Sequence, residues 1–346
     1  MTGDGCCGWI HARYEVRLHT PDNKNKDKEV FIKQSNRRQF IKDLGVLGGI
    51  AFAATHVLAS FADDDYPFSS GTQAPRLRVP AQACDCHHHI YDRAFPYYDD
   101  RNLPTASVED YRRIQKRLGL TRSVVIQPSS YATDNRCLLA ALAKLGPQSR
   151  GIAVVDDKVE MAELRRLHEQ GVRGIRFNLG VGSATSVDMI EPLSKMIADL
   201  GWHIEIHTRP DELIQMEALL SQLPVQVVFD HFGRIPLPAG NDHPVFKMIA
   251  RLIDKDRAWV KVSGAYQDSV LGGPDYDDVK DLARAMIALA PERVVWGTDW
   301  PHPSLQSKKK PMPDDASMFD LLQVWAQNDV MIDKILVQNP ARLYGF

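Results

Sequence analysis

The sequence predicts a single (β/α)8 barrel, the TIM-barrel architecture, formed by residues 83–346. Three observations support this prediction. Apolar, β-branched runs recur eight times, helical patterns separate them, and the alternation fits within about 260 residues. An open doubly wound sheet is the alternative, but no Gly-x-Gly-x-x-Gly segment follows the first apolar run. The barrel is therefore the favoured fold.

The expected elements alternate from the first strand to a closing helix. Strands are expected at 83–89, 123–127, 151–155, 172–177, 202–207, 225–231, 258–263 and 293–299. Helices are expected at 108–118, 135–145, 159–169, 188–200, 211–223, 244–254, 277–290 and 317–327, with a closing helix at 331–343. Active sites of such barrels lie at the carboxyl ends of the strands, so polar side chains there are the candidates for chemistry.

The first 62 residues have the features of an export signal. Residues 36–40 (Asn-Arg-Arg-Gln-Phe) match a twin-arginine motif, 44–59 is apolar, and Ser60 and Ala62 fit a signal-peptidase site. The apolar stretch is shorter than the roughly 20 residues that span a membrane, so no stable membrane anchor is expected. We expect the twin-arginine export machinery as a partner, a periplasmic location, and a linker at 63–82.

Charge and cysteine content narrow the possible functions. Residues 63–346 carry 33 Lys or Arg and 38 Asp or Glu, a net charge near −5, and they contain no basic stripe. Nucleic acid binding is therefore not expected. Cys84, Cys86 and Cys137 are odd in number and irregularly spaced, which argues against a disulfide framework even in an oxidising compartment.

Histidines and one aspartate gather at the expected strand ends. His87 and His89 end the first strand, His207 ends the fifth, His231 ends the sixth and Asp299 ends the eighth. Alternate side chains of a strand share a face, so His87 and His89 point together. Imidazole and carboxylate are ligands of transition metals, so His87, His89, His207 and Asp299 predict a site for one divalent metal, zinc or manganese. A site without metal is the alternative.

Asp299 is the expected general base, which takes a proton from water and passes it to the leaving group. His231 is expected to act beside it, either as a fifth metal ligand or as a hydrogen-bond donor to the substrate carbonyl. His302 follows the last strand and could touch the substrate. The loop with Tyr97 and Tyr98 is expected to cover the site.

Other polar residues on the strands are expected to be structural. His88 should face the helices, because it alternates with its neighbours. Glu205 should be paired within a polar layer inside the barrel that includes Lys261, since buried charges need partners. By the same alternation, Asp230 should point outward.

Three motifs resemble the amidohydrolase superfamily, in its amidohydrolase-related (type 2) branch: Asp85-x-His87-x-His89, 229–234 (Phe-Asp-His-Phe-Gly-Arg) and 296–302 (Trp-Gly-Thr-Asp-Trp-Pro-His). The resemblance extends over about 75–346 through 171–178 and 339–344. It implies hydrolysis of a cyclic ester, with Asp299 activating water and with Arg176 and Arg234 holding a substrate carboxylate.

Two departures from the lactonases of this branch refine the expectation. Where dicarboxylate lactonases have further arginines, this chain has 180–183 (Gly-Val-Gly-Ser) and Tyr266-Gln267. With fewer cations to bind carboxylates, the expected substrate is a monoanionic or neutral polyol lactone. His207, absent from the metal-free lactonases, favours metal. The expected substrate-binding residues are Arg176, Arg234, Asn178, Gln127, Tyr98 and His302. The expected reaction is lactone opening; the alternatives are non-oxidative decarboxylation of an aromatic or unsaturated carboxylate and a non-catalytic binding barrel.

Overall fold

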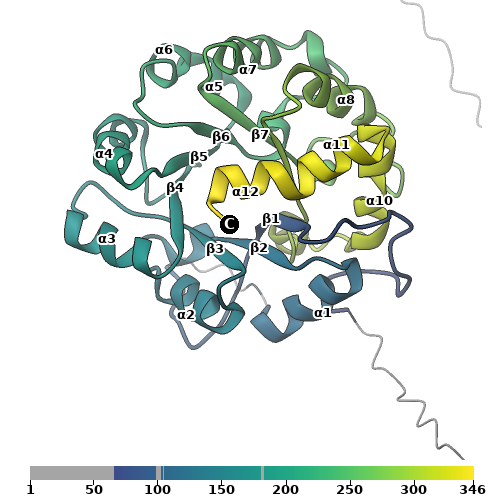
Figure 1. Cartoon of the computed structure of the whole chain (residues 1–346), viewed down its shortest axis with the longest axis horizontal. Coiled ribbons are helices and arrows are strands. Elements are labelled where there is room, and N and C mark those ends of the chain that lie inside the picture. Colours follow the sequence, from purple (N-terminus) through teal and green to yellow (C-terminus); the bar gives the residue numbers. More distant parts are fainter. Residues whose placement is uncertain (1–65, 99–102, 104, 181–182) are drawn as a thin grey trace, which may run out of the picture. The chain divides into compact units, whose positions relative to one another are not determined.

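Eight parallel strands form one sheet, in the order β1 to β8, in a computed structural model that describes residues 66–98, 103, 105–180 and 183–346. The strands are β1 Cys84–His88, β2 Arg122–Ile126, β3 Ser149–Ala153, β4 Val172–Asn178, β5 His203–His207, β6 Val227–Phe229, β7 Ala258–Ser263 and β8 Val294–Gly297. Backbone hydrogen bonds join the two ends of the sheet: His89 N donates to Trp300 O, and Asp299 N donates to His87 O, both at 2.8 Å. The expected eight-stranded barrel architecture is confirmed (Figure 1).

Helices surround the strands (Figure 1). They are α1 Val108–Leu118, α2 Arg136–Leu145, α3 Met161–Glu169, α4 Ile190–Ile197, α5 Pro210–Gln215, α6 Glu217–Leu220, α7 Pro244–Asp254, α8 Lys280–Leu289, α9 Pro303–Ser307, α10 Asp315–Ala326, α11 Asp329–Asp333 and α12 Asn339–Tyr344. The helix expected at 211–223 is divided into α5 and α6. The expected closing helix is α11 and α12, joined by a π-helical turn at Lys334–Gln338.

Helix α1 shows how local sequence sets the boundaries of an element. Ser107 and Asp110 form a capping box at its start, and Gly119 ends it in a left-handed conformation with φ 71°. Tyr111, Ile114 and their neighbours on the same face are fully buried. The pattern of caps and apolar spacing therefore places α1 as expected, with its buried face against the strands.

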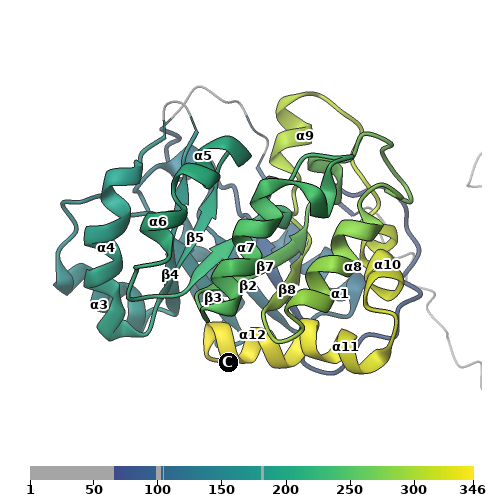
Figure 2. The ribbon, with the colours of Figure 1, turned by 90° about the horizontal axis from the view of Figure 1, so that it is seen from above.

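Helix α12 closes the amino-terminal end of the barrel, and Figures 1 and 2 show it crossing that end. Tyr344 is fully buried in a cluster with Cys84 and Cys86, and its hydroxyl donates to Glu205 Oε1 at 3.2 Å. Strand β8 approaches β1 so closely that a Cβ on Gly297 would lie 2.6 Å from His87 N. The opposite end of the barrel, where the strands finish, is the one left for chemistry.

The segment before β1 packs on the barrel. Trp300 Nε1 donates to Pro67 O at 2.8 Å, and Arg76 Nε lies 2.9 Å from Asp320 Oδ2 on α10. The expected export signal at 1–62 lies outside the described residues. Among the residues that are described, no helix is long and apolar enough to cross a membrane, and the three cysteines are free.

Candidate active site

Three side chains form a tight triangle where β1 meets β8. His87 Nε2 and His89 Nε2 are 3.3 Å apart, and Asp299 Oδ1 lies 3.5 Å from the first and 3.4 Å from the second. All three side chains are buried. The closure of the barrel therefore brings together residues from the two ends of its sequence, as the sequence predicts.

The triangle fits a small divalent ion. Ligands of a tetrahedral zinc at about 2.1 Å lie about 3.4 Å from one another, which matches all three separations. His89 Nδ1 is 2.8 Å from Ile126 O, and donation to this carbonyl leaves the Nε2 lone pair directed into the triangle. His87 Nδ1 is 3.3 Å from Asp230 Oδ1 and 3.2 Å from Lys261 Nζ, so His87 offers Nε2 to a metal only in the tautomer that carries its proton on Nδ1. The three residues of the triangle form one of the His/Asp groups in the described chain that could hold a metal.

The expectation that Asp230 points outward is wrong. Its Oδ2 accepts a hydrogen bond from Arg176 Nε at 3.0 Å, and its Oδ1 lies 3.4 Å from Lys261 Nζ, inside the barrel. Asp230 is still extended, with φ −67° and ψ 145°, and alternation places it on the same side as Val228, which packs in the barrel interior. The backbone leaves the extended conformation only at His231, with a φ of 47°, so counting back from His231 gives Asp230 the wrong side. Burial alone would raise the pKa of Asp230, but Lys261, His87 and Arg176 hold that pKa well below its usual value.

A buried ion pair between Lys261 and Glu205 inside the barrel contacts His87. Lys261 Nζ lies 2.6 Å from Glu205 Oε2 and 3.2 Å from His87 Nδ1, and all three side chains are inaccessible to solvent. The expected pairing of Glu205 with Lys261 is confirmed. His88, by contrast, stacks on Tyr111 of α1 with ring centroids 3.5 Å apart, which confirms its structural position.

His231 lies beside the triangle. Its Nε2 is 3.8 Å from Asp299 Oδ1, and its Nδ1 is 2.9 Å from Ser263 Oγ. Burial lowers the pKa of His231, so the ring is neutral near pH 7 and carries one proton. The ring can thus donate a hydrogen bond from Nε2 while Nδ1 is hydrogen-bonded to Ser263 Oγ.

His207 lies apart from the triangle and belongs to neither His/Asp group that could hold a metal in the described chain. Its Nε2 faces Arg234 Nη1 at 3.3 Å, and its Nδ1 has no hydrogen-bond partner among the described residues. Burial and the charge of Arg176 hold the pKa of His207 well below its usual value. A neutral imidazole accepting from a guanidinium at Nε2 has no lone pair left for a metal.

Asp299 is anchored through one oxygen. Tyr266 Oη and Gln267 Nε2 both donate to Oδ2, at 2.5 and 2.8 Å, which leaves Oδ1 facing the histidines. Its φ of 59° is unusual for a residue other than glycine and places strain at the site. Burial alone would raise the pKa of Asp299, but the neighbouring histidines hold it well below the usual value. Asp299 is therefore ionised at neutral pH.

The sequence did not single out Tyr266 and Gln267 as partners of Asp299, although they lie only three and four residues beyond the end of β7. His302, expected at the substrate, is instead fully buried behind Tyr266. Its Nδ1 is 3.3 Å from Tyr266 Oη and its Nε2 is 3.2 Å from Asp315 Oδ2. His302 thus contacts Asp299 only through Tyr266.

Two adjoining cavities open at this end of the barrel. One, of about 210 Å3, is lined by His89, His231, Arg176 and Gln267 among others. The second, of about 410 Å3, shares Asn178 and His207 with the first and extends to Arg234 and Asp268. His89 of the triangle and the expected residue Arg176 line the smaller cavity, Arg234 lines the larger one, and Asn178 lines both.

Two further expected substrate residues lie away from these cavities. Gln127 is fully buried, and its Nε2 donates to Asp134 O at 2.8 Å. Tyr98 is 70% exposed and lines a separate cavity with Tyr131.

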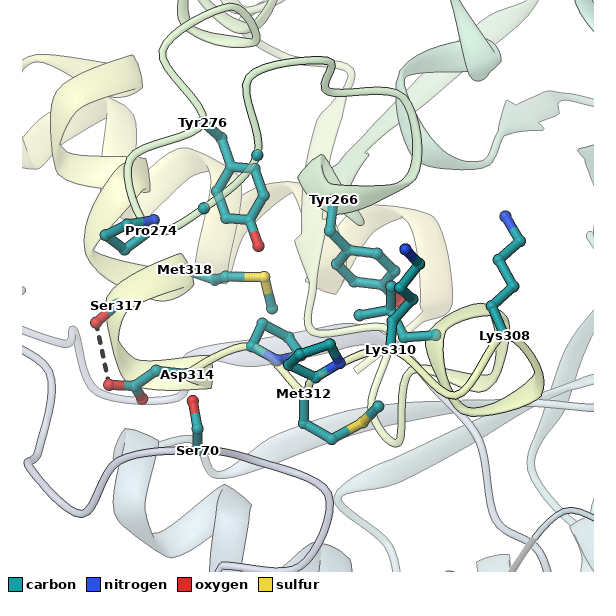
Figure 3. Close-up of a pocket in the computed structure, with 15 residues that line it drawn as sticks. Ser70, Tyr266, Pro274, Tyr276, Lys308, Lys310, Met312, Asp314, Ser317 and Met318 are labelled. Carbon is teal, nitrogen blue, oxygen red and sulfur yellow. Dashed lines mark hydrogen bonds between the residues drawn. The ribbon is translucent and has the colours of Figure 1, made fainter. Parts of the chain in front are cut away.

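On the other side of Tyr266 is a cavity of about 510 Å3 at Met312 and Met318, which Figure 3 shows. No residue of the triangle lines that cavity.

Comparison with known proteins places the chain in a family. The model of the family described as Amidohydrolase (Amidohydro_2) matches residues 84–346. The chain belongs to this amidohydrolase family. The amidohydrolase is 35% identical over 287 residues to a 4-sulfomuconolactone hydrolase of Rhizobium radiobacter, covering 79% of this chain and 95% of the relative. It is 35% identical over 284 residues to a 2-pyrone-4,6-dicarboxylate hydrolase of Comamonas testosteroni, covering 78% and 92%.

The amidohydrolase also resembles a D-galactarolactone isomerase of Agrobacterium fabrum, with 29% identity over 279 residues, 80% of this chain and 94% of the relative. Among solved structures, an apo protein of Agrobacterium tumefaciens is 28% identical with a TM-score of 0.72, covering 79% of this chain and 99% of that one. The resemblance inferred from the histidine and aspartate motifs is confirmed at the level of the family.

Replacing Tyr266 with Phe is expected to lower kcat about tenfold, because Asp299 loses a hydrogen bond that fixes its orientation. The lost donor favoured the ionised carboxylate, so the pKa of Asp299 rises and the acidic limb of the kcat/KM profile moves to higher pH. The measurement is the pH profile of both proteins. An unchanged acidic limb would show that Tyr266 does not act on Asp299.

Proposed function

We propose that this amidohydrolase opens a lactone by hydrolysis, with Asp299 as general base. The observation that carries the proposal is the orientation of its carboxylate: Oδ2 is held by Tyr266 and Gln267 while Oδ1 faces His87 and His89. A buried, ionised carboxylate with one oxygen fixed is suited to taking a proton from a water molecule. Relatives named as lactone hydrolases support a cyclic ester as the substrate.

In the proposed reaction, Asp299 Oδ1 removes a proton from water as the water oxygen attacks the lactone carbonyl carbon. The bond from this carbon to the ring oxygen breaks, and Asp299 returns the proton to the departing alkoxide. His231 donates from Nε2 to the carbonyl oxygen, with Ser263 Oγ donating to Nδ1. The product is a hydroxy acid, and Asp299 is again an ionised carboxylate at the end of the reaction.

We further propose that His87, His89 and Asp299 hold one divalent metal, zinc or manganese. The three separations of 3.3, 3.4 and 3.5 Å support this ligand set. His207 is left out of it, because its Nε2 faces Arg234. When bound, the ion supplies Lewis-acid chemistry, lowering the pKa of water and polarising the carbonyl.

A lactone panel tests the reaction. The purified protein is incubated with five- and six-membered lactones, neutral and carboxylated, and acid release is followed with a pH indicator. Ring opening that disappears in Asp299→Asn supports the proposal. Release of CO2 from aromatic or unsaturated carboxylates without ring opening would instead indicate the decarboxylase alternative. Ligand binding with no turnover of any compound would favour a binding barrel.

Metal analysis of two histidine variants tests the ligand set. The purified protein is expected to contain close to one divalent ion per chain and to lose activity in chelator. His89→Ala should lose most of this metal, whereas His207→Ala should keep it, because only His89 contributes a ligand atom to the triangle. Metal content is read by elemental analysis, independently of activity. Equal loss of metal in both variants would show that His207 is also a ligand. Full activity in chelator would show that the reaction does not need a metal.

A further inference from the structure

Arg234 already holds a carboxylate of its own chain. Its Nε and Nη2 lie 2.7 and 2.8 Å from Asp268 Oδ2 and Oδ1, a bidentate pair, and its Nη1 faces His207. A guanidinium binds a carboxylate most strongly through two parallel N–H donors, and these two donors are occupied here. The fork formed by Nε and Nη2 of Arg234 is therefore not available to a substrate anion.

The other arginines of the two cavities also have a carboxylate partner, although through fewer contacts than Arg234. Arg176 donates to Asp230 at 3.0 Å, and Arg209 donates through Nε to Glu212 at 3.0 Å. Among the described residues that line the two cavities, no Lys is present and each Arg has a carboxylate partner. Every positive charge among these described lining residues thus lies beside a carboxylate.

The Arg234–Asp268 pair is also positioned to meet a substrate. Both side chains line the 410 Å3 cavity, which shares the lining residues Asn178 and His207 with the smaller cavity. Their side chains are 25% and 23% exposed, so the pair faces the cavity and is only partly buried. A substrate substituent that extends from the triangle past His207 reaches this pair.

We propose that Asp268 determines the charge of the substrate, by neutralising Arg234 so that this end of the cavity accepts an uncharged, hydroxyl-bearing substituent. The paired groups offer both donors and acceptors to hydroxyls, whereas a carboxylate placed there would meet the negative charge of Asp268. The inference rests on the proposed lactone opening and sharpens it to neutral polyol lactones. Asp268 directly follows Tyr266 and Gln267, so one short segment after β7 both anchors Asp299 and sets this preference.

The test compares two lactones that differ only at one carbon, a sugar lactone with a terminal CH2OH and its counterpart with a terminal carboxylate. The full chain should favour the neutral lactone in kcat/KM. Asp268→Ala frees the fork of Arg234, so the anionic-to-neutral ratio of kcat/KM should rise roughly 10- to 100-fold. The double variant Asp268→Ala/Arg234→Ala should lose that gain, since the cation that binds the carboxylate is removed.

Glu212→Gln is the matched control. It removes one negative charge from the same cavity, at a carboxylate paired with Arg209 instead of Arg234. Its ratio should change by no more than about threefold, the effect of a screened charge. An equal rise in Asp268→Ala and Glu212→Gln would overturn the proposal, as would an unchanged ratio in Asp268→Ala.

A binding measurement separates this inference from the proposed reaction. Citrate is titrated calorimetrically into the full chain and into Asp268→Ala, which needs no turnover. Tighter binding to Asp268→Ala, reversed by Arg234→Ala, supports the role of Asp268 even if no lactone is opened. Equal affinity in the two proteins refutes it even if lactones are opened.

Discussion

Asp299→Asn is expected to lower kcat/KM for lactone opening by about 1,000-fold. The amide can still accept hydrogen bonds from Tyr266 and Gln267, so the side chain keeps its orientation, but it cannot take a proton from water. The measurement is steady-state kinetics on the best lactone of the panel. The loss should fall on kcat, because the substitution removes a proton transfer rather than a contact with the bound lactone.

The control for this variant is its folding. Its circular dichroism and urea unfolding should match those of the parent protein, since the substitution is close to isosteric. A rate within about tenfold of the parent would exclude Asp299 as the general base and direct attention to another group in the cavity.

Lys261→Met is expected to lower the free energy of unfolding by about 3–5 kcal/mol. Lys261 is fully buried and neutralises Glu205 at 2.6 Å, with Asp230 at 3.4 Å. Methionine fills a similar volume but leaves Glu205 without its cation, while Asp230 keeps its pair with Arg176, and an unpaired buried charge is costly. Urea unfolding followed by circular dichroism measures the change.

Two comparisons isolate the buried pair. The double variant Lys261→Met/Glu205→Gln should recover part of the lost stability, because the charge left unpaired on Glu205 is removed with the cation. Lys195→Met breaks a pair with Glu191 whose side chains are 64% and 57% exposed, and should cost less than about 1 kcal/mol. Similar losses in Lys261→Met and Lys195→Met would contradict a stabilising role for the buried layer.

Much of the site could be predicted from strand positions. Alternation along β1 directs His87 and His89 to the same side, and the position of Asp299 at the end of β8 implies that it meets them when the barrel closes. The pairing of Glu205 with Lys261 follows from the requirement that buried charges be compensated. These predictions depend on local geometry and on a general energetic rule, both of which can be read from the chain.

The prediction for the direction of Asp230 failed and the substrate role of His302 stays a prediction, and both residues lie just beyond a strand. Asp230 points inward because it is still extended and lies on the same side as Val228, whereas the backbone turns at His231, from which the alternation was counted. His302 is buried behind Tyr266, although it follows the last strand as closely as a substrate-binding residue would. Alternation governs extended chain only, so it carries no information on where a turn directs a side chain.

The sequence by itself determined the barrel, the family motifs and the meeting of His87, His89 and Asp299, because the 2- and 3.6-residue periods and the order of strands dictate which side chains share a face. Only the tertiary structure decided what each polar atom contacts. It pairs His207 with Arg234 and Arg234 with Asp268, and it joins Tyr266 and Gln267 to one oxygen of Asp299. These contacts join loops that are separate in sequence, and their distances depend on how the whole barrel packs.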